Sequence, residues 1–206
     1  MVGAATAVVE AMVPDGEDGT VLVIDGGHGR AEVSVVEVVH GMIHALHHNA
    51  SEALSGERFA RAVGQWIRKS LQDASVEPWF DEGLTARVAE ALGHATPGAD
   101  LVVQVPLVGP REVPSGLVAA VGRHAATHMA RFINDTLEDA SLRRDAIDRV
   151  LVTGGLCRCP EVRAAIDAWW GAPVTHCDHD VVARGAAIYG GELLGLRHAA
   201  RISDVA

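Results

Sequence analysis

The sequence predicts an α/β fold in which helices flank a mixed sheet and a smaller α+β subdomain is inserted. Two apolar runs, residues 20–25 and 149–152, lead into glycine pairs, as buried strands do before a tight turn. Residues 30–39 alternate apolar and polar side chains, which is typical of a strand. From Gly56 onward the apolar residues recur at helical spacing instead.

In the first half of the chain, we expect a helix over residues 5–13 and three successive strands over residues 20–25, 30–39 and 41–46. The helix that begins at Gly56 has its apolar stripe at Phe59, Val63, Trp66, Ile67 and Leu71. The segment Pro-Trp-Phe at residues 78–80 ends this helix.

The second half of the chain alternates helices and strands. We expect helices over residues 84–92, 115–142, 161–170 and 181–194, and strands over residues 101–107, 149–152 and 174–176. The strand at 101–107 stands alone because Gly109 and Pro110 bound it. Pro160 opens one helix at its first turn, and Asp178 or Asp180 caps the last one.

The composition is that of an acidic globular protein. Of the 206 residues, 49% are hydrophobic and 21% are charged, and the formal net charge is −10. Nucleic acid and anionic membranes are disfavoured as partners because both require a basic face. No apolar run approaches the roughly 20 residues of a membrane-spanning helix. Three cysteines cannot all pair with one another, which disfavours a fold held together by disulfides. We therefore expect a reducing compartment, the cytoplasm.

The first candidate site is the turn Asp-Gly-Gly-His-Gly-Arg at residues 25–30. Glycines let backbone N–H groups converge on an anion, and a carboxylate such as Asp25 at a strand end can hold a hydrated divalent cation. A plain hairpin turn with the same glycines is the alternative interpretation.

The second candidate site is Thr-Gly-Gly-Leu-Cys-Arg-Cys-Pro at residues 153–160. A strand, a glycine pair and a helix opened by proline place backbone amides and the Arg158 guanidinium where a base or a phosphate fits. The alternative is an ordinary connection between a strand and a helix.

Together with residues 178–187, these turns resemble the actin-like ATPase superfamily, and most closely the DnaK-type, seventy-kilodalton heat-shock chaperones. Residues 21–37 look like that family's second phosphate motif, and residues 54–59 are similar to its Leu-Gly-Gly-Glu-Asp-Phe. Residues 150–160 match its adenosine motif, and residues 181–191 match its Ala-Val-Ala-Arg-Gly-Ala-Ala helix. The resemblance implies a ribonuclease-H-like lobe.

The resemblance implies the second lobe of the family's two-lobed ATPase domain. Residues 1–54 and 122–206 correspond to the core of this lobe, and residues 55–121 to its inserted subdomain. The first lobe supplies another phosphate loop and a catalytic lysine, so we expect a chain truncated at both ends. Residues 196–206 are similar to the linker that leads into the peptide-binding domain.

The resemblance also implies which residues bind ATP or ADP with Mg²⁺. In the first turn they are Asp25, Gly26, Gly27, His28, Gly29 and Arg30, and Asp25 reaches the cation through water. His28 replaces a glycine and obstructs the close approach of phosphate. Arg30 replaces the threonine near the γ-phosphate, and Glu32 replaces the following aspartate.

In the second turn, the expected nucleotide contacts are Gly154, Gly155 and Arg158, and the resemblance implies that Arg158 stacks on the base. Leu156 and Cys157 replace small hydroxyl residues. His179 in the later tail motif completes the expected set. The family's Glu/Lys clasp on the adenosine has its nearest counterparts in Arg87 and Glu90, with the charges reversed.

Two groups of metal-ligating residue types need an interpretation of their own. His40, His44, His47 and His48 favour a polar surface stretch over a metal site. Zinc binding or redox chemistry is an alternative for a second group, although the usual two-residue cysteine spacing is absent. This second group consists of Cys157, Cys159, His176, Cys177 and His179.

Three functional classes follow. The first is a lobe of a chaperone ATPase that binds nucleotide and does not hydrolyse it alone, because phosphoryl transfer needs groups on both sides of the phosphate. Its implied partners are the first lobe, a nucleotide-exchange factor and a J-domain co-chaperone. The second is a non-catalytic module that binds a partner through residues 55–121, and the third is a metal or redox protein.

Overall fold

A mixed sheet lies at the centre of the computed structural model, which describes residues 3–14, 16–73, 81–96, 98–105, 107–172, 174–195 and 202–203. Its strands lie in the order β7-β6-β1-β2-β3-β8. Their bounds are β1 Gly19–Gly26, β2 Ala31–Val39, β3 Met42–Ser51, β6 Arg149–Thr153, β7 Thr175–His176 and β8 Ile202–Ser203.

Strand β1 makes the sheet mixed, because it runs antiparallel to β2 and parallel to β6. Its run of four apolar residues is buried on both faces, with Val21 and Val23 on one side and Leu22 and Ile24 on the other. At its end Asp25 pairs in register with Glu32 of β2 and with Thr153 of β6. This register brings both predicted sites to one end of the sheet.

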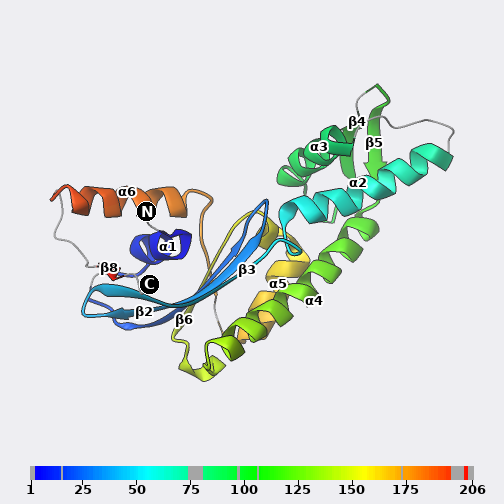
Figure 1. Ribbon diagram of the computed structural model, residues 1–206. Helices are drawn as coiled ribbons and strands as arrows, with labels where there is room; N and C mark the ends of the chain where they lie inside the picture. The colour runs from blue at the N-terminus through cyan, green and yellow to red at the C-terminus, as the bar shows by residue number, and fades with distance from the viewer. Residues whose placement is uncertain are drawn as a thin grey trace.

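Helices cover the two faces of the sheet (Figure 1). Helices α1 and α6 lie on one face, and α4 and α5 lie on the other. Their bounds are α1 Ala4–Met12, α4 Ser115–Asp139, α5 Pro160–Trp170 and α6 Val181–Leu193. Helices α1 and α6 pack closely because Gly185 has no side chain, and a Cβ atom there would overlap the carbonyl oxygen of Ala7.

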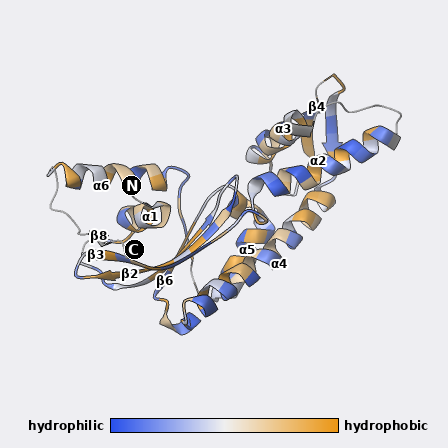
Figure 2. Ribbon diagram, viewed as in Figure 1, coloured by the Kyte–Doolittle hydropathy of each residue, from blue (hydrophilic) through white to orange (hydrophobic). Residues whose placement is uncertain are grey.

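The remaining elements extend away from α1 and α6 (Figure 1). They are α2 Gly56–Asp73, α3 Asp81–Gly93, and the hairpin of β4 Leu101–Val105 and β5 Gly109–Val113. Apolar and hydrophilic residues interchange along α2 (Figure 2), and the predicted stripe is its buried face, with Trp66 partly buried. The division at residues 55 and 121 stays a prediction.

The structure confirms the α/β class and the mixed sheet, and it corrects several local expectations. The strand at 101–107 is not alone, because Pro110 lies within β5. Proline is tolerated there because both strands of a two-stranded sheet are edges, where a missing N–H group need not break a ladder. Strand β3 continues to Ser51, and α4 ends at Asp139 rather than 142.

Two further expectations concern the ends of helices. Asp180 stands at the N-cap of α6, but its side chain makes no capping hydrogen bond. The predicted break at 78–80 lies outside the described residues, as do residues 196–201 and 204–206 of the linker-like segment.

Among the described helices, none is long and apolar enough to cross a membrane.

Candidate functional site

The two glycine turns are in direct contact, because they follow the parallel neighbours β1 and β6. Gly154 has a φ of +88°, a conformation that L side chains rarely adopt. A Cβ atom at this position would also overlap the Asp25 carboxylate and lie 2.5 Å from the carbonyl carbon of Gly26. Gly154 therefore serves the close approach of the two turns.

Cys157 of the second turn packs against Gly26 of the first turn. This residue is 3% exposed, and a Cβ atom on Gly26 would lie 2.6 Å from its Sγ. Burial raises the pKa of the Cys157 thiol to about 12, although a hydrogen bond with the Gly26 backbone partly opposes this shift. The thiol is protonated at neutral pH and acts here as a buried packing group.

The first turn is held from its other side by the start of α2. The backbone N–H of Gly56 donates to the carbonyl oxygen of Gly27 at 3.0 Å, and that of Glu57 donates to the carbonyl oxygen of His28 at 2.8 Å. These N–H groups belong to the first turn of the helix, where intrahelical acceptors are missing. Residues 54–59, which are similar to the family's Leu-Gly-Gly-Glu-Asp-Phe, thus hold the turn at residues 25–30 in place.

A pocket of about 690 Å³ lies between these turns and the helices α2, α3 and α4. Four of the predicted residues line it, Gly27 and His28 from the first turn and Gly155 and Arg158 from the second. Arg158 is exposed and is the only Arg or Lys among the described lining residues. The structure therefore brings both predicted turns to one concave site.

The other predicted residues do not line this pocket. Asp25, Gly26 and Gly154 form the contact between the two turns behind it. Gly29 stands at the open side of the first turn, where a Cβ atom would meet nothing within 4 Å. His179 is exposed in the segment between β7 and α6.

Arg30 also lies outside the lining and is engaged by a neighbour. Its Nε donates to Oε1 of Glu32 at 2.5 Å, and its side chain is 59% exposed. Glu32 pairs in register with Asp25 on the adjacent strand. Burial, and after it the negative charge of Glu32, raises the pKa of the Asp25 carboxyl above 3.8.

These carboxylates do not fit the family's Mg²⁺ as they stand. Magnesium is usually held by one or two ionised carboxylates together with phosphate oxygens and waters. Here the Glu32 carboxylate is already paired with the guanidinium of Arg30. Asp25 is then the remaining carboxylate, and burial disfavours its ionised form. In the described part of the chain, no three His, Cys, Asp or Glu side chains form a metal-binding group.

The wall opposite the second turn differs from the expected clasp. Arg87 and Glu90 bind each other at 3.0 Å on the exposed side of α3, and neither lines the pocket. Helix α3 instead contributes Ala89, Leu92 and Gly93. The sequence analysis did not predict this apolar wall. The small and apolar residues that follow Arg87, on the opposite side of the helix, could have indicated it.

The start of α4 was missed as well. Ser115, Gly116, Val118 and Ala119 line the same pocket, where α4 begins after the β4–β5 hairpin. The available signal was the Ser-Gly pair at the predicted helix start. Its small side chains leave room for a ligand against the first helical turn.

Neither the cysteine group nor the histidine group brings together three metal-ligating side chains among the described residues. Cys159 donates to Oε2 of Glu161 at 3.0 Å, and burial raises the pKa of its thiol to about 11. Burial also raises the pKa of the Cys177 thiol. Three of the four clustered histidines follow one another along β3, and His48 meets Ser34 Oγ at 3.0 Å through its Nδ1.

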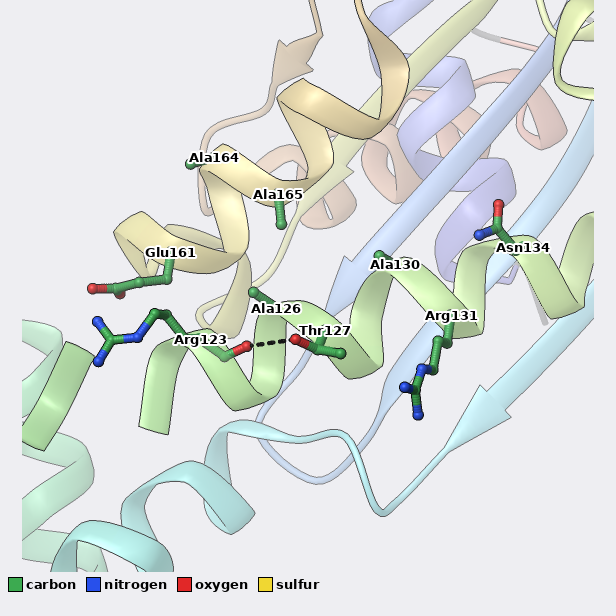
Figure 3. Close-up of a pocket in the computed structure, with 9 residues that line it drawn as sticks. All are labelled: Arg123, Ala126, Thr127, Ala130, Arg131, Asn134, Glu161, Ala164 and Ala165. Carbon is green, nitrogen blue, oxygen red and sulfur yellow. Dashed lines mark hydrogen bonds between the residues drawn. The ribbon is translucent and has the colours of Figure 1, made fainter. Parts of the chain in front are cut away.

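A second, shallow hollow lies between α4 and α5 (Figure 3). Alanines of both helices line it, and of the two α4 arginines Arg123 points toward Glu161 of α5 whereas Arg131 points away from α5 (Figure 3). The Thr127 hydroxyl donates to the Arg123 carbonyl oxygen at 3.0 Å, so it is used within the helix. This hollow holds none of the predicted site residues, so the site between the two turns remains the candidate.

Comparison with known proteins agrees with the motifs. Residues 3–93 and 123–206 match the family model described as Hsp70 protein. A chaperone protein HscA homolog of Janthinobacterium sp. (strain Marseille) is 31% identical over 194 residues, which cover 90% of this chain and 31% of that protein. A chaperone protein DnaK of Mycoplasmopsis pulmonis is 29% identical over 191 residues, covering 85% and 32%. The chain spans about a third of the length of these relatives.

Proposed function

The chain belongs to the Hsp70 family of actin-like ATPases, and on that premise we propose that it forms one lobe of a chaperone ATPase domain and binds ATP or ADP between its two glycine turns. The observation that most supports this proposal is the pocket that joins Gly27 and His28 to Gly155 and Arg158. These four residues come from two motifs that lie far apart in the sequence and meet only in the fold.

Members of this family work with nucleotides and co-chaperones, and they bind ATP or ADP, typically with Mg²⁺. For this chain we propose base stacking on Arg158, whose planar guanidinium is exposed at the pocket. Backbone N–H groups of the two turns would receive the phosphates. A cytoplasmic location, a role in the stress response, and exchange-factor or J-domain partners belong to the same proposal.

We further propose that this 206-residue chain binds nucleotide weakly and does not hydrolyse it alone. Phosphoryl transfer depends on positioned charges on both sides of the phosphate, and the described pocket offers Arg158 as its only Arg or Lys. The obstruction expected from His28 is consistent with weak binding, because His28 is one of the residues that line the pocket.

Calorimetric titration of the chain with ADP and ATP tests the proposal, together with an assay of phosphate release. We expect saturable binding with a dissociation constant on the order of 0.1 mM or weaker, and phosphate release no faster than the blank. Replacing Arg158 with alanine should weaken binding, whereas Arg163→Ala on the exposed side of α5 should not. Absence of binding, or turnover by the chain alone, would contradict the corresponding part of the proposal.

A further inference from the structure

The ion pair between the exposed Arg30 and the partly buried Glu32 places a positive charge at the first turn. The Arg30 guanidinium forms an ion pair with the Glu32 carboxylate, and Glu32 pairs in register with Asp25 on the neighbouring strand. Gly27, three residues before Arg30, lines the nucleotide pocket. A cationic side chain therefore stands beside the two carboxylates at which a divalent cation would otherwise be attracted.

We propose that Arg30 replaces the divalent cation at this turn, so that the chain binds nucleoside diphosphates and triphosphates without Mg²⁺. The inference rests on the proposed function, since it concerns the phosphates of the same nucleotide. On binding, the guanidinium exchanges the Glu32 carboxylate for phosphate oxygens. No bond is made or broken in this exchange other than hydrogen bonds and ion pairs.

The chemistry of the side chain suits this exchange. A guanidinium presents its N–H donors in a planar fork that matches two phosphate oxygens, and it stays charged at all physiological pH values. The Arg30 side chain is 59% exposed, so water already reaches it and little packing is lost when it turns. Arg30 is the exposed partner of this pair and the Glu32 side chain is 19% exposed, so the exchange moves the guanidinium and leaves Glu32 in place.

Electrostatics disfavours a second cation at the same place. A Mg²⁺ ion near Asp25 would be repelled by Arg30 or would have to displace it from Glu32. With a net charge of −10, a local cation favours the binding of phosphate, and Arg158 is the only Arg or Lys among the described pocket residues. Arg30 is thus a cationic side chain next to the first turn that can supply this charge.

The test measures binding of ADP that carries a fluorescent ribose label, in excess Mg²⁺ and in excess EDTA. We expect the two dissociation constants to agree within about threefold. Arg30→Gln should weaken labelled ADP about tenfold in both conditions and leave the affinity for adenosine, which has no phosphate, unchanged. Arg30→Thr should make binding stronger in Mg²⁺ than in EDTA.

Arg143→Gln is the control, because Arg143 also pairs with a carboxylate two residues along the chain, Asp145, and both of these side chains are exposed outside the pocket. It should leave every affinity unchanged, and thermal melts should show that the variants at position 30 remain folded. Binding that disappears in EDTA overturns the inference and leaves the proposed function standing. Failure of ADP and adenosine to bind in either condition overturns the proposed function and this inference together.

Discussion

The two glycine turns occupy equivalent places at the ends of neighbouring parallel strands, yet they are constructed differently. In the second turn, Gly154 has a positive φ and its missing side chain leaves room for Asp25 and Gly26. In the first turn, a Cβ atom on Gly29 would meet nothing within 4 Å. Gly26 of the first turn is confined as well, because a Cβ atom there would lie 2.6 Å from Cys157 Sγ, and Gly155 of the second turn is as open as Gly29. The turns therefore differ in that only the second has a glycine with positive φ, and both are confined where they meet and open on their other sides.

The contact between the two turns concerns stability, whereas their open sides concern binding. Changes behind the second turn should affect folding, because Cys157 and Gly154 pack against the end of β1. Changes in His28, Arg30 and Arg158 should affect ligands instead, because these side chains line the pocket or stand exposed beside it. The following variants examine that separation.

Gly154→Ala should have the largest effect. Alanine would have to adopt a φ of +88°, and its Cβ would overlap the Asp25 carboxylate and the Gly26 backbone. We expect a loss of about 3 kcal/mol or more in the free energy of unfolding, measured by urea denaturation.

The neighbouring glycine offers the control. Gly155 has a φ of −63°, and a Cβ atom there would meet nothing within 4 Å. Gly155→Ala should therefore change the free energy of unfolding by less than about 0.5 kcal/mol. Equal losses for the two variants would show that the second turn does not depend on close approach to β1.

Arg158→Ala should reduce nucleotide affinity without destabilising the protein. Arg158 is exposed and lines the pocket, so removing its guanidinium should take away the proposed stacking and cationic contact with the ligand. We expect about a tenfold weaker dissociation constant by calorimetry and an unchanged melting temperature. A marked loss of stability would show that Arg158 has a structural role.

His28→Gly should strengthen binding modestly if the imidazole obstructs the phosphates. Glycine removes a lining side chain and adds backbone freedom, which costs about 0.5 to 1 kcal/mol of stability. We expect about a threefold gain in affinity for ATP, with no gain for adenosine. An equal gain for both ligands would place the obstruction at the nucleoside rather than at the phosphates.

The sequence was most informative where one residue type meets one physical requirement. The apolar run from Val21 to Ile24 predicted a strand buried on both faces, and Pro160 predicted the first turn of α5. The motif glycines predicted that two turns would contribute to one site. The structure brings Gly27 and Gly155 to the same pocket.

The remaining features depend on contacts between distant elements. Proline usually bounds a strand, so the sequence did not predict β5. In the structure Pro110 is tolerated because β5 is an edge strand. The apolar wall at Ala89 and Leu92 follows from how α3 is turned, which local spacing does not determine. Likewise, the pair of Arg30 with Glu32 depends on side-chain direction at the strand end.

Asp25→Asn should have the smallest effect, at the joint between the two turns. Burial, and then Glu32, raises the pKa of Asp25 above 3.8, so folding disfavours its charged form. The wild type therefore loses stability as pH rises from about 3.8 through the raised pKa, and the asparagine variant avoids this loss. Thermal melts should show the variant more stable at neutral pH, with the difference shrinking as pH falls toward 3.8. Asp145→Asn is the opposite control, because Arg143 lowers the pKa of that exposed carboxyl, so no gain is expected at neutral pH. A gain for Asp25→Asn that did not vary with pH would mean that packing at the joint, rather than its charge, limits stability.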